Sequence, residues 1–485
     1  MDLEIENRLN LASQLHAAGK YQEALQMALP GLERSARSHD PLVKAWCCNE
    51  VGFYCLHAGV YEKAIGLFQE ALEIRRRVLG SDHPNTATCI NNLAAFHSQM
   101  GQYEAALPLY QEALEIRRRV SGSDHPSTAA SINNLASLHQ SLGQYEAAMP
   151  LFQEALEICR RVLGSDHPDT ATSISNLAHL NARMGQYEAA MPLFQEVLAI
   201  EDRMMRRHFR VMSQAERVAY ADRFLSTLFV ACTLVAIHRA NDAGAVEWLY
   251  EAVLRRKEAE TLLLAAQREA LLGERAEYAP YTGDLRRWIA LQEQVSQAAM
   301  ANPHDPALPA LRAEADTLER RLAMVIPEIT KEHQSMTVAR SAVALSLPES
   351  SALIEFVKYR RFDVTKKKSS WAEERYLAFA VTPAALHLVE LGDAEPIDAL
   401  VQTFLAEADS AAGRGASDAT FIDTDWQDNA RTSLQEIFTR VLLPLQPLLT
   451  GKSRLLVAPD GPLAFVPFDL LEDAAGRSVG DNMSR

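Results

Sequence analysis

The sequence is poor in cysteine and in the short motifs that mark metal and nucleotide sites. It contains no Cys-x-x-Cys pair, no His-Glu-x-x-His and no glycine-rich phosphate loop. All six cysteines fall within sequence of helical pattern, so we interpret them as small, buried apolar residues of a reduced protein. We expect neither a metal ion nor a cofactor. The six are Cys47, Cys48, Cys55, Cys89, Cys159 and Cys232.

Positive charge and long apolar runs are also scarce. The formal net charge is −15, which argues against nucleic-acid binding because such proteins usually present a basic face. The arginine runs at 75–77 and 117–119 alternate with glutamates, so we interpret them as a solvated face. The most apolar stretch, 225–237, is too short to span a bilayer, and the N-terminal residues have no signal-peptide pattern. We therefore expect a cytoplasmic protein without nucleic-acid or membrane partners.

What the sequence does contain is a block of about forty-two residues that recurs along its first third. The segment that starts at Gly101 is followed by a close copy that starts at Gly143. One tyrosine recurs at a constant interval, as Tyr61, Tyr103, Tyr145 and Tyr187. A fixed period predicts a solenoid, in which each unit buries its apolar face against its neighbours. A solenoid presents a long concave surface, which favours binding over catalysis.

Each repeat divides into two helices. In the second full unit, a helix A over residues 86–100 ends at Gly101, where glycine accommodates a left-handed backbone. Helix B covers 103–120, and Pro126 begins the next helix A, where its missing N–H has no cost. Near the ends of the B helices, i,i+4 pairing is predicted for Glu73–Arg77, Glu115–Arg119 and Glu157–Arg161.

These residues resemble the tetratricopeptide repeat (TPR). The Gly-x-Tyr, Ala, Phe/Tyr and Ala-Leu positions match its consensus over about residues 45–205, and a degenerate unit precedes them. The long unit, ALEIRRRVLGSDHP followed by INNLA, is similar to the repeats of kinesin light chains and of many bacterial TPR proteins. The resemblance implies an α–α superhelix whose concave groove is lined by the A helices.

Helical spacing places polar residues of successive A helices on the groove side. Asn92, Asn134 and Asn176 form a ladder, and an asparagine amide both donates and accepts hydrogen bonds. TPR proteins often hold peptide backbones in this way, so the resemblance implies an extended peptide or protein partner. The alternative is that these amides cap or bridge neighbouring helices. The predicted groove residues are Asn91, Asn92, Asn133, Asn134, Asn176 and Arg183.

Histidines also recur with the repeat. His83, His125 and His167 lie in successive inter-repeat loops. Neighbouring helices pack about 8–10 Å apart, so three such imidazoles cannot share one ion at about 2 Å. His97 and His139 stand at a helix A packing position and are interpreted as core histidines.

The period disappears after residue 205. Residues 206–335 still have helical patterns, whereas 336–485 contain short β-branched and aromatic runs, as in SALIEFVKYRRF and RYLAFAV, that predict strands separated by helices. The predicted fold is mainly α, with three parts. These are a solenoid over 1–205, a helical connector over 206–335 and a smaller α/β segment over 336–485.

The last part resembles the N-terminal portion of a CHAT domain, a caspase-like module found with TPRs. The resemblance rests on LIEFVKY, RYLAFAVTP, HLVELGDAEPIDALV and LLVAPDGPLAFVPFDLL, in this order. It implies a catalytic His–Cys pair beyond the last of these motifs, but the last cysteine here is Cys232. We therefore carry over no catalytic residue and expect no peptidase activity from this chain. A longer parent could be a cysteine endopeptidase; the alternative is a stand-alone TPR adaptor with a pseudo-protease platform.

An incomplete sheet leaves its last strand unpaired, which favours self-association through the C-terminal segment.

Overall fold

The computed structural model confirms a mainly α protein with a small sheet near its C-terminus. Its contacts define two compact units, Met1–Ile200 and Glu201–Arg485. The division of the second unit at residue 335 stays a prediction. The structure describes residues 3–17, 20–209, 220, 224–272, 281, 283–284, 286–288, 290–291, 294–295, 308–325, 340–363, 371–413 and 424–471.

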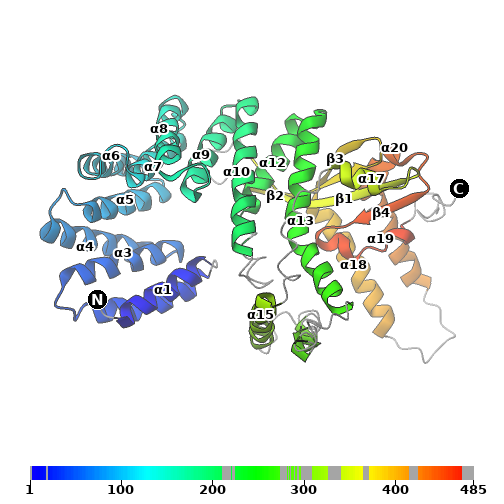
Figure 1. Ribbon diagram of the computed structural model, residues 1–485, viewed down its shortest axis with the longest axis horizontal. Helices are drawn as coiled ribbons and strands as arrows, with labels where there is room; N and C mark the ends of the chain where they lie inside the picture. Colours follow the sequence, from blue (N-terminus) through cyan, green and yellow to red (C-terminus); the bar gives the residue numbers. More distant parts are fainter. Residues whose placement is uncertain are drawn as a thin grey trace. The chain divides into compact units, whose positions relative to one another are not determined.

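The first unit is a stack of antiparallel helix pairs (Figure 1). Odd-numbered helices are the A helices of the repeat and even-numbered helices are the B helices. The pairs are α1 (Leu3–Ala17) with α2 (Tyr21–Ser35), α3 (Pro41–His57) with α4 (Tyr61–Leu79), α5 (Pro84–Gln99) with α6 (Tyr103–Val120), α7 (Pro126–Ser141) with α8 (Tyr145–Leu163), and α9 (Pro168–Arg183) with α10 (Tyr187–Phe209).

The repeated sequence sets both helix boundaries. Each B helix from α4 to α10 begins at the recurrent tyrosine, and Gly101 has a φ of 73°, as its place at the end of helix A predicts. Each A helix from α5 to α9 begins at a proline and is capped by the histidine before it. The Nδ1 atom of His125 accepts the backbone N–H of Ser127 at 3.1 Å. His83 and His167 make the same bond, so these loop histidines are N-caps.

We expect His125→Ala to lower the free energy of unfolding by about 0.5–2 kcal/mol, because it removes the acceptor for a helix N-terminal donor. His125→Asn keeps an acceptor and is the matched control. Urea titration followed by circular dichroism measures both. Equal loss in the two variants would contradict a capping role.

The core of the first unit alternates large and small side chains at the repeat interval. Aromatic rings of the B helices are buried at four equivalent positions, and buried alanines lie one turn before them. In the first full repeat, Gly52 of α3 takes the small position opposite Phe68; a Cβ there would meet the ring at 3.0 Å. The aromatic positions are Phe68, Tyr110, Phe152 and Phe194.

Two arginines of the repeat are structural. Arg117 is 9% exposed; its Nη1 donates to the carbonyl of Ser127 at 2.6 Å, and burial lowers its pKa. Arg75 is 7% exposed and makes the same bond to Asn85. Each guanidinium ties the end of a B helix to the start of the next A helix. The interpretation of these arginines as a solvated face was therefore wrong for Arg75 and Arg117.

Five other arginines of the repeats pair between repeats. Arg118 contacts Glu154 at 2.7 Å, and Arg76 and Arg160 make the equivalent contact thirty-six residues ahead. Arg119 and Arg161 pair with Asp82 and Asp124 of the preceding connectors. The expected i,i+4 partners Glu115 and Glu157 are thus not the ones these two arginines use. Because these pairs are exposed, each contributes about 0–1 kcal/mol.

The second unit combines helices with a four-stranded sheet. Its strands are β1 (Ser351–Phe362), β2 (Trp371–Val381), β3 (Leu386–Asp393) and β4 (Arg454–Ala458), in the order β3-β2-β1-β4. The first three are antiparallel, and β4 is parallel to β1. Its helices include α12 (Leu225–His238), α13 (Ala243–Leu272), α15 (Leu308–Val325), α17 (Arg340–Ser346), α18 (Ala394–Gly413), α19 (Thr424–Val441) and α20 (Gln446–Leu449), with 3-10 turns at Leu443–Leu445, Gly461–Phe465 and Phe468–Leu470.

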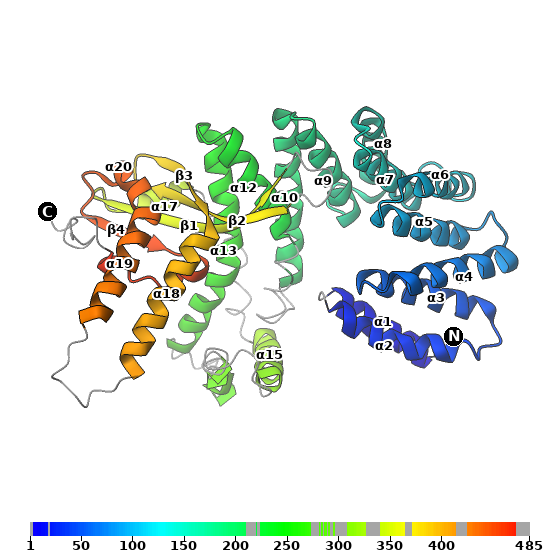
Figure 2. The ribbon, with the colours of Figure 1, turned by 180° about the vertical axis from the view of Figure 1, so that it is seen from behind.

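Helices cover both faces of the sheet. Helices α18 and α19 pack on one face, against Ile354 and Phe356 (Figure 2). On the other face, the Tyr250 ring of α13 contacts Phe379 in a tilted arrangement with ring centroids 5.1 Å apart, and Thr233 of α12 accepts the N–H of Phe362. The strands expected from the sequence are thus confirmed. The loop expected at TKKKSS lies outside the described residues.

Candidate functional site

The predicted asparagine ladder lies on the A helices of the first unit, where its members bond to one another. Asn92 Nδ2 of α5 donates to Asn49 Oδ1 of α3, and Asn134 Nδ2 of α7 donates to Asn91 Oδ1 of α5, both at 2.9 Å. Asn91, Asn92 and Asn134 are half-buried. These bonds join neighbouring A helices, which is the bridging role that the sequence left open.

The rung between α7 and α9 differs. Asn133 is 9% exposed and its Nδ2 donates to Ser173 Oγ at 2.8 Å, but its Oδ1 has no hydrogen-bond partner among the described residues. By the pattern of the other rungs, that oxygen would accept from Asn176. The half-buried Asn176 makes no such bond. The asparagine pairs between α3 and α5 and between α5 and α7 are thus hydrogen bonded (closed rungs). The pair between α7 and α9 is not (the open rung), and it leaves polar groups without a partner on the A-helix face.

The end of this face carries His179 and Arg183, both half-buried on α9. The His179 ring meets Phe194 edge-on, with centroids 5.2 Å apart. Burial, and then the nearby Arg183 guanidinium, lower the pKa of His179 to about 4. His179 is therefore neutral at pH 7, and Arg183 supplies the positive charge at this end.

This pKa predicts acid sensitivity in the first unit. In the unfolded chain His179 becomes protonated below the ordinary histidine pKa of about 6.5, whereas in the folded protein it stays neutral down to about pH 4. The stability contributed by this residue therefore falls as pH drops through that window, by about 3 kcal/mol. We expect His179→Leu to remove this part of the pH dependence in urea titrations between pH 7 and 4. An unchanged pH profile would contradict it.

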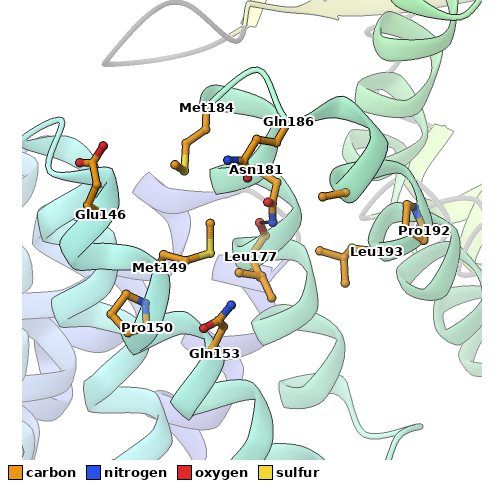
Figure 3. A pocket seen from close by; sticks show the side chains of 11 residues that line it. Glu146, Met149, Pro150, Gln153, Leu177, Asn181, Met184, Gln186, Pro192 and Leu193 are labelled. Atoms are coloured by element: carbon orange, nitrogen blue, oxygen red, sulfur yellow. Dashed lines mark hydrogen bonds between the residues drawn. The ribbon is translucent and has the colours of Figure 1, made fainter.

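A pocket opens on a different side of the same repeats. The starts of α8 and α10 flank it and the end of α9 lies between them (Figure 3). Its volume is about 590 Å³, and its lining includes Met149, Leu177, Met184 and Leu193, with Glu146 and Asn181 as polar members. None of the six predicted groove residues lines it. The signal that marks it in the sequence is Asn181, which stands where earlier repeats have His97 and His139.

Those two histidines are only half-buried. The Nδ1 atoms of His97 and His139 lie 2.6 and 2.7 Å from Gln102 and Gln144 Oε1. The interpretation as core histidines is therefore corrected: each ring belongs to a surface pair that closes the helix A–helix B turn.

No cysteine is placed as a nucleophile. All six are free and buried, and burial raises the pKa of each thiol, to about 12 for Cys48. A raised pKa keeps a thiol protonated at neutral pH and so unreactive. In the part of the chain that the structure describes, no group of three or more His, Cys, Asp or Glu side chains is arranged to hold a metal ion.

The Pro-Asp-Gly turn of the second unit is tied to the sheet. Asp460 Oδ2 accepts the backbone N–H of Lys358 at 2.7 Å, and its Oδ1 accepts that of Gly461 at 2.9 Å. The Lys358 ammonium is itself held by Glu374 and Asp398, at 2.7 and 2.9 Å. These groups satisfy one another, so the cluster is a structural support for the turn.

The similarity to a known protein family lies in the first unit. A family model described as the tetratricopeptide repeat matches residues 44–119, 89–158 and 128–201. These residues thus form TPRs, a protein-interaction module. No curated protein matches the chain. Within the described residues, no helix has the length and apolar character needed to cross a membrane.

Several solved structures are similar to part of the chain. A putative kinesin light chain of Podosopora anserina with nearly identical TPR-like repeats is 27% identical; the match covers 41% of this chain and 96% of that one, with a TM-score of 0.35. BtubC (BKLC) from P. vanneervenii is 24% identical over 41% and 80%, with a TM-score of 0.36. A Rap protein complexed with competence and sporulation factor is 16% identical over 69% and 77%, with a TM-score of 0.40.

Proposed function

We propose that the face formed by α3, α5, α7 and α9 binds an extended peptide segment of a partner protein. The carrying observation is the open rung of the asparagine ladder. There, Asn133 Oδ1 and the Asn176 amide make no hydrogen bond within the described residues, although Asn133 is almost fully buried. Asn133 Oδ1 is itself enclosed, so the group that a ligand backbone can reach at this rung is the half-buried Asn176 amide, which offers both a donor and an acceptor.

The chemistry of the face favours the backbone of the ligand over its side chains. Amides and hydroxyls offer both donors and acceptors, as the peptide backbone does. The closed rungs, Asn92–Asn49 and Asn134–Asn91, hold the A helices at fixed spacing and so preorganise the face. Arg183 lies seven residues after Asn176, almost on the same side of α9, and adds a cation at one end.

The test uses a peptide selected from a random twelve-residue library on the full chain. We expect the Asn134→Ala, Asn176→Ala double variant to bind it at least tenfold more weakly. Asn85→Ala removes an exposed amide at the start of α5 and is the matched control. Urea titration checks that the double variant stays folded. Unchanged affinity with unchanged stability would contradict peptide binding by these amides.

For the second unit we propose that residues 336–485 correspond to the N-terminal part of a CHAT caspase-like domain, to which the repeats recruit a substrate or regulator. The order of strands and helices supports this, as does the tie between the Pro-Asp-Gly turn and β1. The family's catalytic His and Cys have no counterpart in this sequence, so the chain itself would not cleave peptides. Sequencing the downstream reading frame tests the proposal: a His-Gly motif and a later Cys would support it, whereas their absence would favour a TPR adaptor with a pseudo-protease platform.

We further propose a cytoplasmic protein that self-associates through β4. Within the described residues β4 pairs only with β1, and Leu455, Leu456 and Val457 are half-exposed rather than buried. Such an edge is open to pairing with another strand. A monodisperse monomer on light scattering, with the β4 amides protected from hydrogen exchange, would contradict self-association.

A further inference from the structure

The pocket between α8 and α10 exists at a junction where the repeat changes. In the two preceding repeats, His97 and His139 hydrogen bond to the glutamine at the start of the following helix B. In the repeat formed by α9 and α10, the equivalent residue is Asn181. Its side chain is shorter than histidine, and its Nδ2 donates to the carbonyl of Leu177 at 2.8 Å. The Gln186 side chain, equivalent to Gln144, then has no partner among the described residues and lines the pocket instead.

The lining combines soft apolar groups with one carboxylate. Figure 3 shows Met149 of α8 pointing toward Leu177 and Met184 of α9, with Leu193 of α10 on the other side. Thioether side chains adapt to ligands of different shape, and the volume of about 590 Å³ lies within the range of ligand pockets, about 300–1,000 Å³. Glu146 is exposed at the rim and makes no ion pair with the described residues.

The same carboxylate recurs along this side of the array. Glu62 and Glu104 occupy the same place in the first turn of α4 and α6, and they are also exposed and unpaired within the described residues. A ligand that approaches the pocket therefore meets a negative line that begins at Glu146. Such a line attracts a basic segment.

From this arrangement we propose a second docking site, which takes a bulky apolar side chain of a partner protein where that side chain is flanked by lysine or arginine. The apolar side chain fills the space left by Asn181, and the basic flank pairs with Glu146. This site goes beyond the proposed peptide groove. The pocket residues Leu177, Asn181 and Met184 lie about 100° around α9 from Asn176 and Arg183.

The experiment uses fluorescein-labelled peptides with a central leucine flanked by lysine, serine or glutamate, and fluorescence anisotropy on the full chain. We expect the lysine-flanked peptide to bind at least tenfold tighter than the glutamate-flanked one. Asn181→His restores the residue of the earlier repeats, so it refills the pocket in a fold that already accommodates histidine there. It is expected to weaken binding at least tenfold.

Two further variants separate the contributions. Ala189→Arg places a long side chain in the pocket from an exposed position of α10 and is expected to act like Asn181→His without touching the core. Glu146→Gln is expected to remove most of the preference for lysine flanks. The Asn134→Ala, Asn176→Ala variant should bind these peptides normally. Absence of binding by the wild-type chain would overturn the proposal, and so would wild-type affinity in both Asn181→His and Ala189→Arg.

Discussion

Replacement of Arg256 by methionine is expected to lower the free energy of unfolding of the second unit by about 3–5 kcal/mol. Arg256 of α13 is 7% exposed, and its Nη2 lies 2.9 Å from Glu201 Oε2 and 3.6 Å from Asp202 Oδ1. Without the guanidinium, the buried Glu201 carboxylate loses its counter-charge, whereas Asp202 keeps Arg255 at 2.9 Å. Removal of one partner of a buried pair typically costs this much because the other charge is left uncompensated.

The pH dependence identifies the mechanism. Burial raises the pKa of Glu201 to about 7, even though Arg256 and the Thr227 hydroxyl favour its charged form. A raised folded pKa means that this carboxyl destabilises the fold as pH rises above its ordinary value of about 4.5 toward 7. The deficit of Arg256→Met should therefore be smaller at pH 5 than at pH 8. Adding Glu201→Gln should restore part of it; an additive loss at both pH values would contradict an ionic role.

Truncation of Phe152 to alanine is expected to cost about 3–5 kcal/mol in the first unit. Phe152 is fully buried in α8, at the position that Phe68, Tyr110 and Phe194 take in the other repeats. The loss combines the transfer of a benzyl group with the cavity that it leaves. Because each repeat contacts only its neighbours, the cavity weakens two interfaces of the stack at once.

Tyr110→Phe is the matched control for this prediction. It gives one repeat the side chain that the others already have, so its expected change is below about 1 kcal/mol. Urea titration followed by circular dichroism compares the two variants. A Phe152→Ala loss as small as that of Tyr110→Phe would mean that the aromatic position is not a core of the stack.

The repeat period predicted the first unit well because it reports on local forces. Tyrosine, glycine and proline positions gave the helix boundaries within a few residues, since each acts on its own backbone. Short runs of β-branched and aromatic residues likewise predicted β1 and β2. In contrast, the apolar run at 455–458 is typical of a buried strand, but β4 is half-exposed at the sheet edge. Burial of an edge strand depends on what lies beside it, which the strand's own sequence does not encode.

The hydrogen-bond partner of a side chain was harder to predict than the helix on which it lies. The sequence pattern of Arg117 is that of a charged surface. In the structure, however, its guanidinium donates to the carbonyl of Ser127, ten residues ahead, in the first turn of the next helix. The capping function of His125 was missed for the same reason. The asparagines were placed on the correct helices, but their bonds to neighbouring repeats required the actual helix spacing. For the proposed docking site the sequence signal is one residue, Asn181, whose meaning appears only by comparison with His97 and His139.

The central claim, that the A-helix face binds a peptide, is tested most directly by locating a bound peptide. A photoreactive phenylalanine derivative is introduced at Ser137 of α7, beside the asparagine ladder, or at exposed Gln153 of α8, on the side of the pocket. With the peptide selected from the random library, we predict crosslinking from position 137 and none from 153. Crosslinking from 153 alone, or from neither position, would contradict the claim.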